Sequence, residues 1–257
     1  MKRLFLFTSF LFSFALKAMT APITIAGDNW CPINCGANDA KQGYMIDVAR
    51  AALKRSGYEV QYLEMPWTRA VGLARKGEVN AIVGAFKGDA PDFHFPAMPL
   101  LKMSPNDLFV TKNSQWTFEN LRSLNKITLG SIKGYDYGDE LNRYIHSMLA
   151  TEDANLIQLY GNDAVTRSLQ FLLKGRIDVL VETGPVFWFH AKQLDVTNKV
   201  KSVGSISQPE PCFIAFSPNL EISPKLVLAF DKGVITLKQE KKLALIAESY
   251  GLPKDAL

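Results

Sequence analysis

The chain has 257 residues, of which 47% are hydrophobic, so it can build one large or two small domains with a sizeable core. Its formal net charge of +4 includes Lys2, Arg3 and Lys17, and without these N-terminal residues the charge is about +1. The other basic residues are scattered and form no stripe or aromatic-interleaved patch, which argues against nucleic acid as a partner.

The first 21 residues have the composition of a secretory signal peptide. Met1–Arg3 is basic, Leu4–Leu16 is apolar, and the small residues Ala18 and Ala21 offer cleavage after residue 18 or residue 21. The apolar run is shorter than the roughly 20 residues that a membrane-spanning helix needs. We therefore expect residues 1–21 to be removed and the rest of the chain to be exported.

Strands and helices alternate in the following part of the chain. Periodicity and glycine stops predict a strand at Ile23–Ala26, a helix at Tyr44–Ser56, a strand at Tyr58–Leu63, a helix opening at Thr68 and a strand at Val79–Val83. This βαβαβ order makes the strands parallel, with their carboxyl ends at one edge. That edge carries Asp28–Trp30, Met65–Trp67 and Gly84–Lys87, which includes the candidate ligand residue Phe86.

The same order returns further along the chain. The predicted elements are a strand at Lys126–Ile132, a helix at Asp139–Leu149, a strand at Leu156–Tyr160 and an αβ unit ending at Val181. That unit repeats the earlier one 98 positions on, since Thr166-Arg167 and Lys174-Gly175 match Thr68-Arg69 and Lys76-Gly77. Two copies predict two α/β lobes that face one cleft.

Two β-type segments are expected to connect the lobes. Asp107–Lys112 leads out of the first lobe, and Cys212–Ser217 returns the chain to it. We therefore expect lobe 1 to comprise residues 22–110 and 209–257, lobe 2 to comprise residues 111–208, and the hinge to lie near Phe109–Lys112 and Pro209–Phe213. The stretch Ser223–Tyr250 is helical by pattern.

Three cysteines leave the pairing open. Cys31 and Cys35 lie in one short loop and could form a local disulfide, while either could instead pair with Cys212. A zinc site is not expected, because none of the three histidines is near the cysteines in sequence. We expect neither a metal ion nor a cofactor.

Four short segments in this order and spacing resemble the bacterial extracellular solute-binding proteins of family 3, the type 2 periplasmic receptors of polar amino-acid importers. They are Met65–Ala70, Lys76–Ala81, Lys133–Gly138 and Lys174–Asp178. The resemblance covers Ile23 to Gly251. It implies a two-lobe α/β fold with a mostly parallel, helix-flanked sheet in each lobe and two crossing hinge strands. It also implies a monomer in the periplasm that captures a small polar solute, amino-acid-like or another charged metabolite, for an ABC-type importer with an inner-membrane permease.

The resemblance also suggests which side chains contact the solute from the first lobe. Trp67 falls where family members place a stacking aromatic, and Trp30 lies where another comes from the first loop; core packing is the alternative for both. The arginine with which amino-acid receptors clamp the ligand carboxylate has no counterpart, because Lys87–Lys102 contains none. Arg69, Lys133 or Lys87 could replace it; the alternative for each, and more so for the two lysines, is a solvated surface charge.

The second lobe offers an acid and two tyrosines. Glu182 ends the last strand of the repeated unit, where family members present a carboxylate to a ligand amine; an inter-lobe ion pair or a favourable helix first turn would also explain it. Tyr135, Asp136 and Tyr137 precede a helix N-terminus, which could bind an anion or a hydroxyl group; capping of the helix by Asp136 explains the segment equally well.

Enzyme signatures are absent from the sequence. There is no nucleophile elbow, no metal-spaced histidine cluster and no Walker-type phosphate loop, so we predict a binding protein and not an enzyme. Two alternatives stay open. One is a cleft enzyme such as a cyclohexadienyl-type dehydratase, in which Glu182 acts as a general acid, and the other is a ligand-sensing accessory protein that is not coupled to transport.

Overall fold

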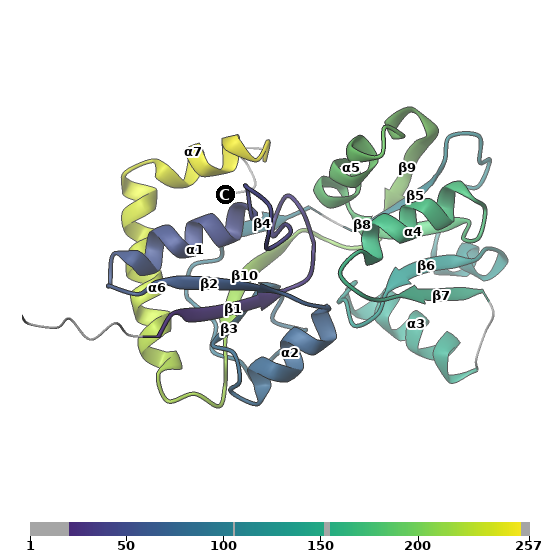
Figure 1. Ribbon diagram of the computed structural model, residues 1–257. Coiled ribbons are helices and arrows are strands. Elements are labelled where there is room, and N and C mark those ends of the chain that lie inside the picture. Colours follow the sequence, from purple (N-terminus) through teal and green to yellow (C-terminus); the bar gives the residue numbers. More distant parts are fainter. Residues whose placement is uncertain (1–20, 105, 152–154, 253–257) are drawn as a thin grey trace, which may run out of the picture.

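The protein, seen in a computed structural model that describes residues 21–104, 106–151 and 155–252, consists of two α/β lobes (Figure 1). The first lobe contains both the beginning and the end of the described chain, and the second contains its middle. Within the described ranges, no helix combines the length and the apolar character needed to cross a bilayer. The predicted signal peptide lies outside the described residues, apart from Ala21.

The first lobe is built on a five-stranded sheet of order β2-β1-β3-β10-β4. Its strands are β1 (Ile23–Gly27), β2 (Val60–Glu64), β3 (Ala81–Ala85), β4 (Leu101–Met103) and β10 (Glu210–Phe216). β1 is parallel to β2 and β3, whereas β10 is antiparallel to β3 and β4. The helices are α1 (Tyr44–Lys54), α2 (Trp67–Arg75), α6 (Ser223–Gln239) and α7 (Lys242–Ser249).

The second lobe repeats this plan with the order β7-β6-β8-β5-β9. Its strands are β5 (Asn106–Thr111), β6 (Leu129–Ile132), β7 (Leu156–Leu159), β8 (Val179–Thr183) and β9 (Val200–Ser205). The helices are α3 (Asp139–Ala150), α4 (Ala164–Leu173) and α5 (Gly184–Gln193), with short 3₁₀ turns at η1 (Leu121–Lys126) and η2 (Thr197–Lys199). The predicted fold, two α/β lobes each built on a largely parallel core, is confirmed.

The predicted repeat corresponds to α2 with β3 and α4 with β8. Both helices end just before a glycine with a left-handed backbone, Gly77 at φ 77° and Gly175 at φ 65°. Glycine is favoured there because a Cβ atom would strain this conformation. The matching Lys-Gly pairs therefore have the same structural role in both lobes.

The chain passes from the first lobe to the second at an earlier residue than the sequence pattern predicts. Phe109–Lys112 was expected at the hinge, but β5 belongs to the second sheet, where it pairs with β8 and β9. Leu108, Phe109 and Val110 are fully buried in that lobe, which explains why the strand cannot lie between the lobes. The chain crosses instead just before β5 and between β9 and β10, so the expected boundary after residue 110 falls inside a strand.

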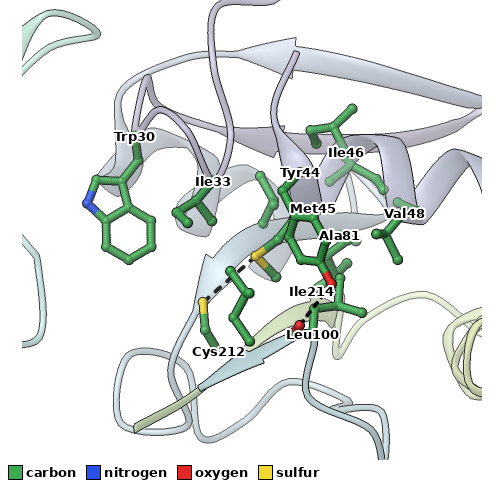
Figure 2. Close-up of a cluster of buried hydrophobic side chains, with 14 of the residues drawn as sticks. Trp30, Ile33, Tyr44, Met45, Ile46, Val48, Ala81, Leu100, Cys212 and Ile214 are labelled. Atoms are coloured by element: carbon green, nitrogen blue, oxygen red, sulfur yellow. Dashed lines mark hydrogen bonds between the residues drawn. The ribbon is translucent and has the colours of Figure 1, made fainter. Parts of the chain in front are cut away.

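The core of the first lobe packs α1 against its sheet, where side chains of both gather in one buried cluster (Figure 2). The same helix also packs against α6. Tyr44 is fully buried and its hydroxyl donates to Leu100 O at 3.1 Å, which satisfies the polar end of an otherwise apolar side chain. Met45 contacts the buried thiol of Cys212, with 3.9 Å between Sδ and Sγ.

Cys31 and Cys35 form the disulfide, and Cys212 is free. Burial raises the pKa of the Cys212 thiol, which keeps it protonated and unreactive. A thiol assay should therefore find no reactive thiol in the native protein, one after denaturation and three after denaturation with reduction. Three thiols before reduction would contradict the disulfide.

Candidate functional site

The carboxyl ends of the central strands of both sheets meet at a small cavity between the lobes. Asp28 follows β1, Phe86 follows β3 and Tyr135 lies after β6, while Glu182 is near the end of β8. The cavity has a volume of about 20 Å³, room for one or two water molecules. Its walls are formed by Asp28, Trp30, Trp67, Val83, Gly84, Phe86, Asp89, Asn106, Tyr135, Asp136 and Glu182.

Trp30 lies in the loop after β1 and reaches across to the second lobe. The disulfide follows it directly, and Trp30 N donates to Asn34 O at 2.8 Å, so the loop forms a tight turn. The indole Nε1 donates to Glu182 Oε1 at 3.0 Å, and Thr183 N donates to the same oxygen at 2.8 Å. Glu182 is only 1% exposed.

Two more hydrogen bonds join the lobes at the cavity. The hydroxyl of Tyr135 donates to Asp28 Oδ2 at 2.5 Å, and Nε1 of Trp67 donates to Gly134 O at 3.0 Å. Trp67 occupies this position because α2 begins with it, directly after Pro66. With three direct hydrogen bonds between the lobes, this arrangement is a closed form.

Aromatic rings form one side of the cavity. Trp30 packs edge-on against Phe86 and against Tyr135, with ring centroids 6.2 Å apart in both pairs. These rings make the wall of the cavity partly aromatic, and the face of an aromatic ring attracts a cationic group.

The sequence profile of the bacterial extracellular solute-binding proteins, family 3, matches residues 23–253. The chain belongs to this family. No curated protein gives a significant match to the sequence of this chain.

Solved structures share the fold of this family 3 protein at low sequence identity. An ancestral arginine-binding protein bound to arginine is 18% identical with a TM-score of 0.72, over 90% of this chain and 99% of that one. A structure from the study of glutathione import in Streptococcus mutans is 17% identical with a TM-score of 0.74, over 92% and 99%. A histidine kinase sensor domain similar to periplasmic binding proteins is 15% identical with a TM-score of 0.72, over 90% and 96%.

Three carboxyl groups at the cavity of this family 3 protein have raised pKa values, in each case mainly because burial disfavours the charged form. The pKa of Asp28 rises to about 6, although the hydrogen bond from Tyr135 partly opposes the rise. The pKa of Glu182 rises to about 7 against the hydrogen bonds from Trp30 and Thr183.

Asp89 is the third of these groups. Its pKa rises to about 7 through burial and the nearby Asp136 and Glu210, against a hydrogen bond from Phe86 N at 2.8 Å. The cavity of the closed form therefore holds three carboxyl groups that ionise near pH 6 to 7, above the usual range of such groups.

The structure brings five of the eight predicted ligand residues to the cavity: Trp30, Trp67, Phe86, Tyr135 and Glu182. They come from both lobes, as two facing strand edges require. A ligand contact by any of them remains a prediction.

Three predicted residues lie elsewhere. Arg69 is exposed, because it follows Trp67 by two helical positions and so projects to another side of α2. Lys133 is also exposed and, with Tyr137, lines an open groove beside the cavity. Tyr137 is buried with its hydroxyl accepting from Ile132 N at 2.7 Å, so it supports the turn after β6.

Asp28, Asp89, Asn106 and Asp136 line the cavity but were not among the predicted ligand residues. Asp28 does lie on the predicted strand edge, and Asp89 lies in the stretch that lacks the expected arginine. Their positions in the sequence could therefore have indicated Asp28 and Asp89 as cavity residues. Asn106 was missed because β5 was assigned to the first lobe.

Proposed function

We propose that this family 3 protein is a monomeric periplasmic receptor that closes its two lobes over a small polar solute and presents the closed form to an ABC importer in the inner membrane. The observation that carries the proposal is the cavity whose walls come from both lobes and whose closure forms the Trp30–Glu182, Tyr135–Asp28 and Trp67–Gly134 hydrogen bonds. The periplasmic location rests on residues 1–21 as a cleaved signal peptide and on the extracellular character of the family.

The lobes must open for a solute to enter, and they must close over it less tightly than in this arrangement, because the cavity here holds little more than one water molecule. We propose lobe 1 as the residues before β5 together with those from β10 onward, and lobe 2 as β5 to β9. The two crossing segments then act as the hinge. A solute that binds the closed form more tightly shifts the population toward it.

A panel of amino acids, amines, organic acids and sugars tests the receptor function. A bound solute should raise the melting temperature, since a ligand at about 100 times its Kd stabilises by about 2.7 kcal/mol. The same solute should reduce the radius of gyration in small-angle X-ray scattering and change the fluorescence of Trp30 and Trp67. The receptor proposal fails if no compound of the panel has these effects.

A variant with an added side chain between the lobes, Gly88→Val, tests closure without changing a residue that lines the cavity. Gly88 is in the loop after β3, and a Cβ atom there would overlap Asp136 Oδ2 of the second lobe. We expect Gly88→Val to weaken binding of the panel's best solute by about 10-fold or more and to reduce the compaction of the protein. The carboxylate of Asp136 can move aside only by losing the hydrogen bonds that its Oδ1 accepts from Gly138 N at 2.8 Å and Asn142 Nδ2 at 2.6 Å.

Gly72→Val is the matched control for Gly88→Val, because a Cβ atom at Gly72 meets no atom within 4 Å. It should bind like the parent protein. Equal affinity of the two variants would show that the lobes do not close as in this structure.

A cleft enzyme is the second candidate, and one observation favours it. Burial raises the pKa of Glu182 to about 7, which suits a general acid near neutral pH. Proton NMR of the best solute incubated with the protein distinguishes the two functions. An unchanged solute supports the receptor, and its conversion supports the enzyme.

A further inference from the structure

Few side-chain hydrogen-bond donors line the cavity between the lobes: those of Trp30, Trp67, Tyr135 and the amide of Asn106. Nε1 of Trp30, Nε1 of Trp67 and the hydroxyl of Tyr135 all donate to acceptors of the facing lobe. The nearby amides of Phe86 and Thr183 donate to Asp89 and Glu182. No lysine or arginine is among the described residues that line the cavity.

Acceptors, in contrast, remain in excess. Glu182 Oε2 is buried and has no hydrogen-bond partner among the described residues, although the side chain lines the cavity. A buried acceptor without a donor is destabilising, so Glu182 Oε2 favours a ligand that donates a hydrogen bond.

The charges point the same way. Four acids, Asp28, Asp89, Asp136 and Glu182, line the cavity together with four aromatic residues, Trp30, Trp67, Phe86 and Tyr135. A carboxylate in this space would meet like charges and no cation. An ammonium or guanidinium group would meet carboxylates and π-faces, both of which attract it.

We propose that the ligand is an organic ammonium or guanidinium cation that carries no carboxylate, with Glu182 as its main charged partner. The inference rests on the receptor function proposed above and narrows its solute class. It departs from an α-amino acid, because the lining of the cavity supplies no cationic partner for the carboxylate.

Binding should release protons. The groups that face the three buried carboxyl groups are themselves acids or neutral donors: Tyr135 and Glu64 at Asp28, Asp136 and Glu210 at Asp89, and Asp28, Trp30 and Thr183 at Glu182. The cation takes the place of a proton on a carboxyl group, and that proton passes to the buffer. Each added positive charge in the cavity lowers the carboxyl pKa.

Two pairs of compounds that differ mainly in the carboxylate test the ligand class: cadaverine with lysine, and agmatine with arginine. Calorimetry on the full exported chain at about pH 6 should show each amine binding about 10-fold or more tightly than its amino acid, as loss of like-charge repulsion requires. Heats measured in two buffers of different ionisation enthalpy should show proton release, which decreases toward about pH 8.

Glu182→Gln should weaken binding of both amines by about 10- to 150-fold, the effect of a lost charge-assisted hydrogen bond. Glu221→Gln, which changes an exposed acid of the first lobe, should bind like the parent. Circular dichroism confirms that both variants are folded. If Glu182→Gln is unfolded, two measurements on the parent protein still test the ligand class. They are its proton release and its preference between the paired compounds.

Equal or tighter binding of the amino acids, unchanged affinity in folded Glu182→Gln, or no saturable binding of either amine overturns the inference. If another solute of the panel binds and compacts the protein, the receptor function stands and only the ligand class fails. If no solute does, both proposals fail.

Discussion

Lowering the pH from about 8 to about 5 is expected to close the protein in the absence of any solute. Closure buries Asp28 and Asp89 of the first lobe beside Glu182 of the second, and their pKa values in the closed form are about 6, 7 and 7. In the open form these groups meet water, and their pKa values should lie near 3.8 for aspartate and 4.5 for glutamate.

The sign of the effect follows from these values. Since the closed form has the higher pKa values, it binds more protons, and its added stability is fully present below the open-form pKa values. That stability is lost as the pH rises through about 6 to 7. For Asp28 alone, a pKa change from 3.8 to about 6 corresponds to about 3 kcal/mol, or roughly a 150-fold change in the closed-to-open ratio.

Small-angle scattering and tryptophan fluorescence across this pH range measure the transition. Glu182→Gln removes one ionisable group and should keep the protein closed to a higher pH than the parent. Exposed Glu221 again supplies the control, because its replacement by glutamine should leave the midpoint unchanged. A radius of gyration independent of pH from about 5 to 8 would show that closure does not depend on these carboxyl groups.

The sequence predicted the lobes well because their signals are local. Helical periodicity, glycine stops and a repeated αβ unit are read within short windows, and parallel βαβ order then places Asp28, Phe86 and Glu182 at strand ends. The assignment of β5 failed for the opposite reason. Its apolar run predicts a strand, but only long-range pairing with β8 and β9 decides which sheet it joins.

The candidate site was predictable in position but less so in chemistry. Trp67 and Glu182 are at the expected strand and helix ends, whereas Arg69 lies two positions after Trp67 in sequence and so projects from another side of the helix. The raised pKa values could not be predicted, because they result from desolvation when two distant segments of the chain come together. The absence of the usual arginine was visible in the sequence. That absence and the buried acids both favour a cationic ligand that carries no carboxylate.

Trp67→Ala should weaken binding of cadaverine or agmatine by about 10- to 100-fold, which is typical when a buried aromatic at the centre of a binding site is truncated. The variant removes a wall of the cavity and the hydrogen bond from Nε1 to Gly134 O, which joins the lobes at 3.0 Å. Trp67→Phe keeps an aromatic face and loses only this bond, so the expected loss is smaller, about 3- to 10-fold.

Trp116→Ala is the matched control for Trp67→Ala. Trp116 is half-buried, its Nε1 donates to the backbone carbonyl of Ser123 at 3.3 Å, and it does not line the cavity. Both alanine variants remove an indole that donates to a main-chain oxygen, but only Trp67 does so across the lobes. Calorimetry should therefore show a loss of affinity in Trp67→Ala and none in Trp116→Ala. An intermediate affinity in Trp67→Phe would indicate that the loss results from the changed side chain at the cavity and not from general destabilisation of the protein. If folded Trp67→Ala binds the amine as the parent does, the solute binds elsewhere and the cavity is not the site.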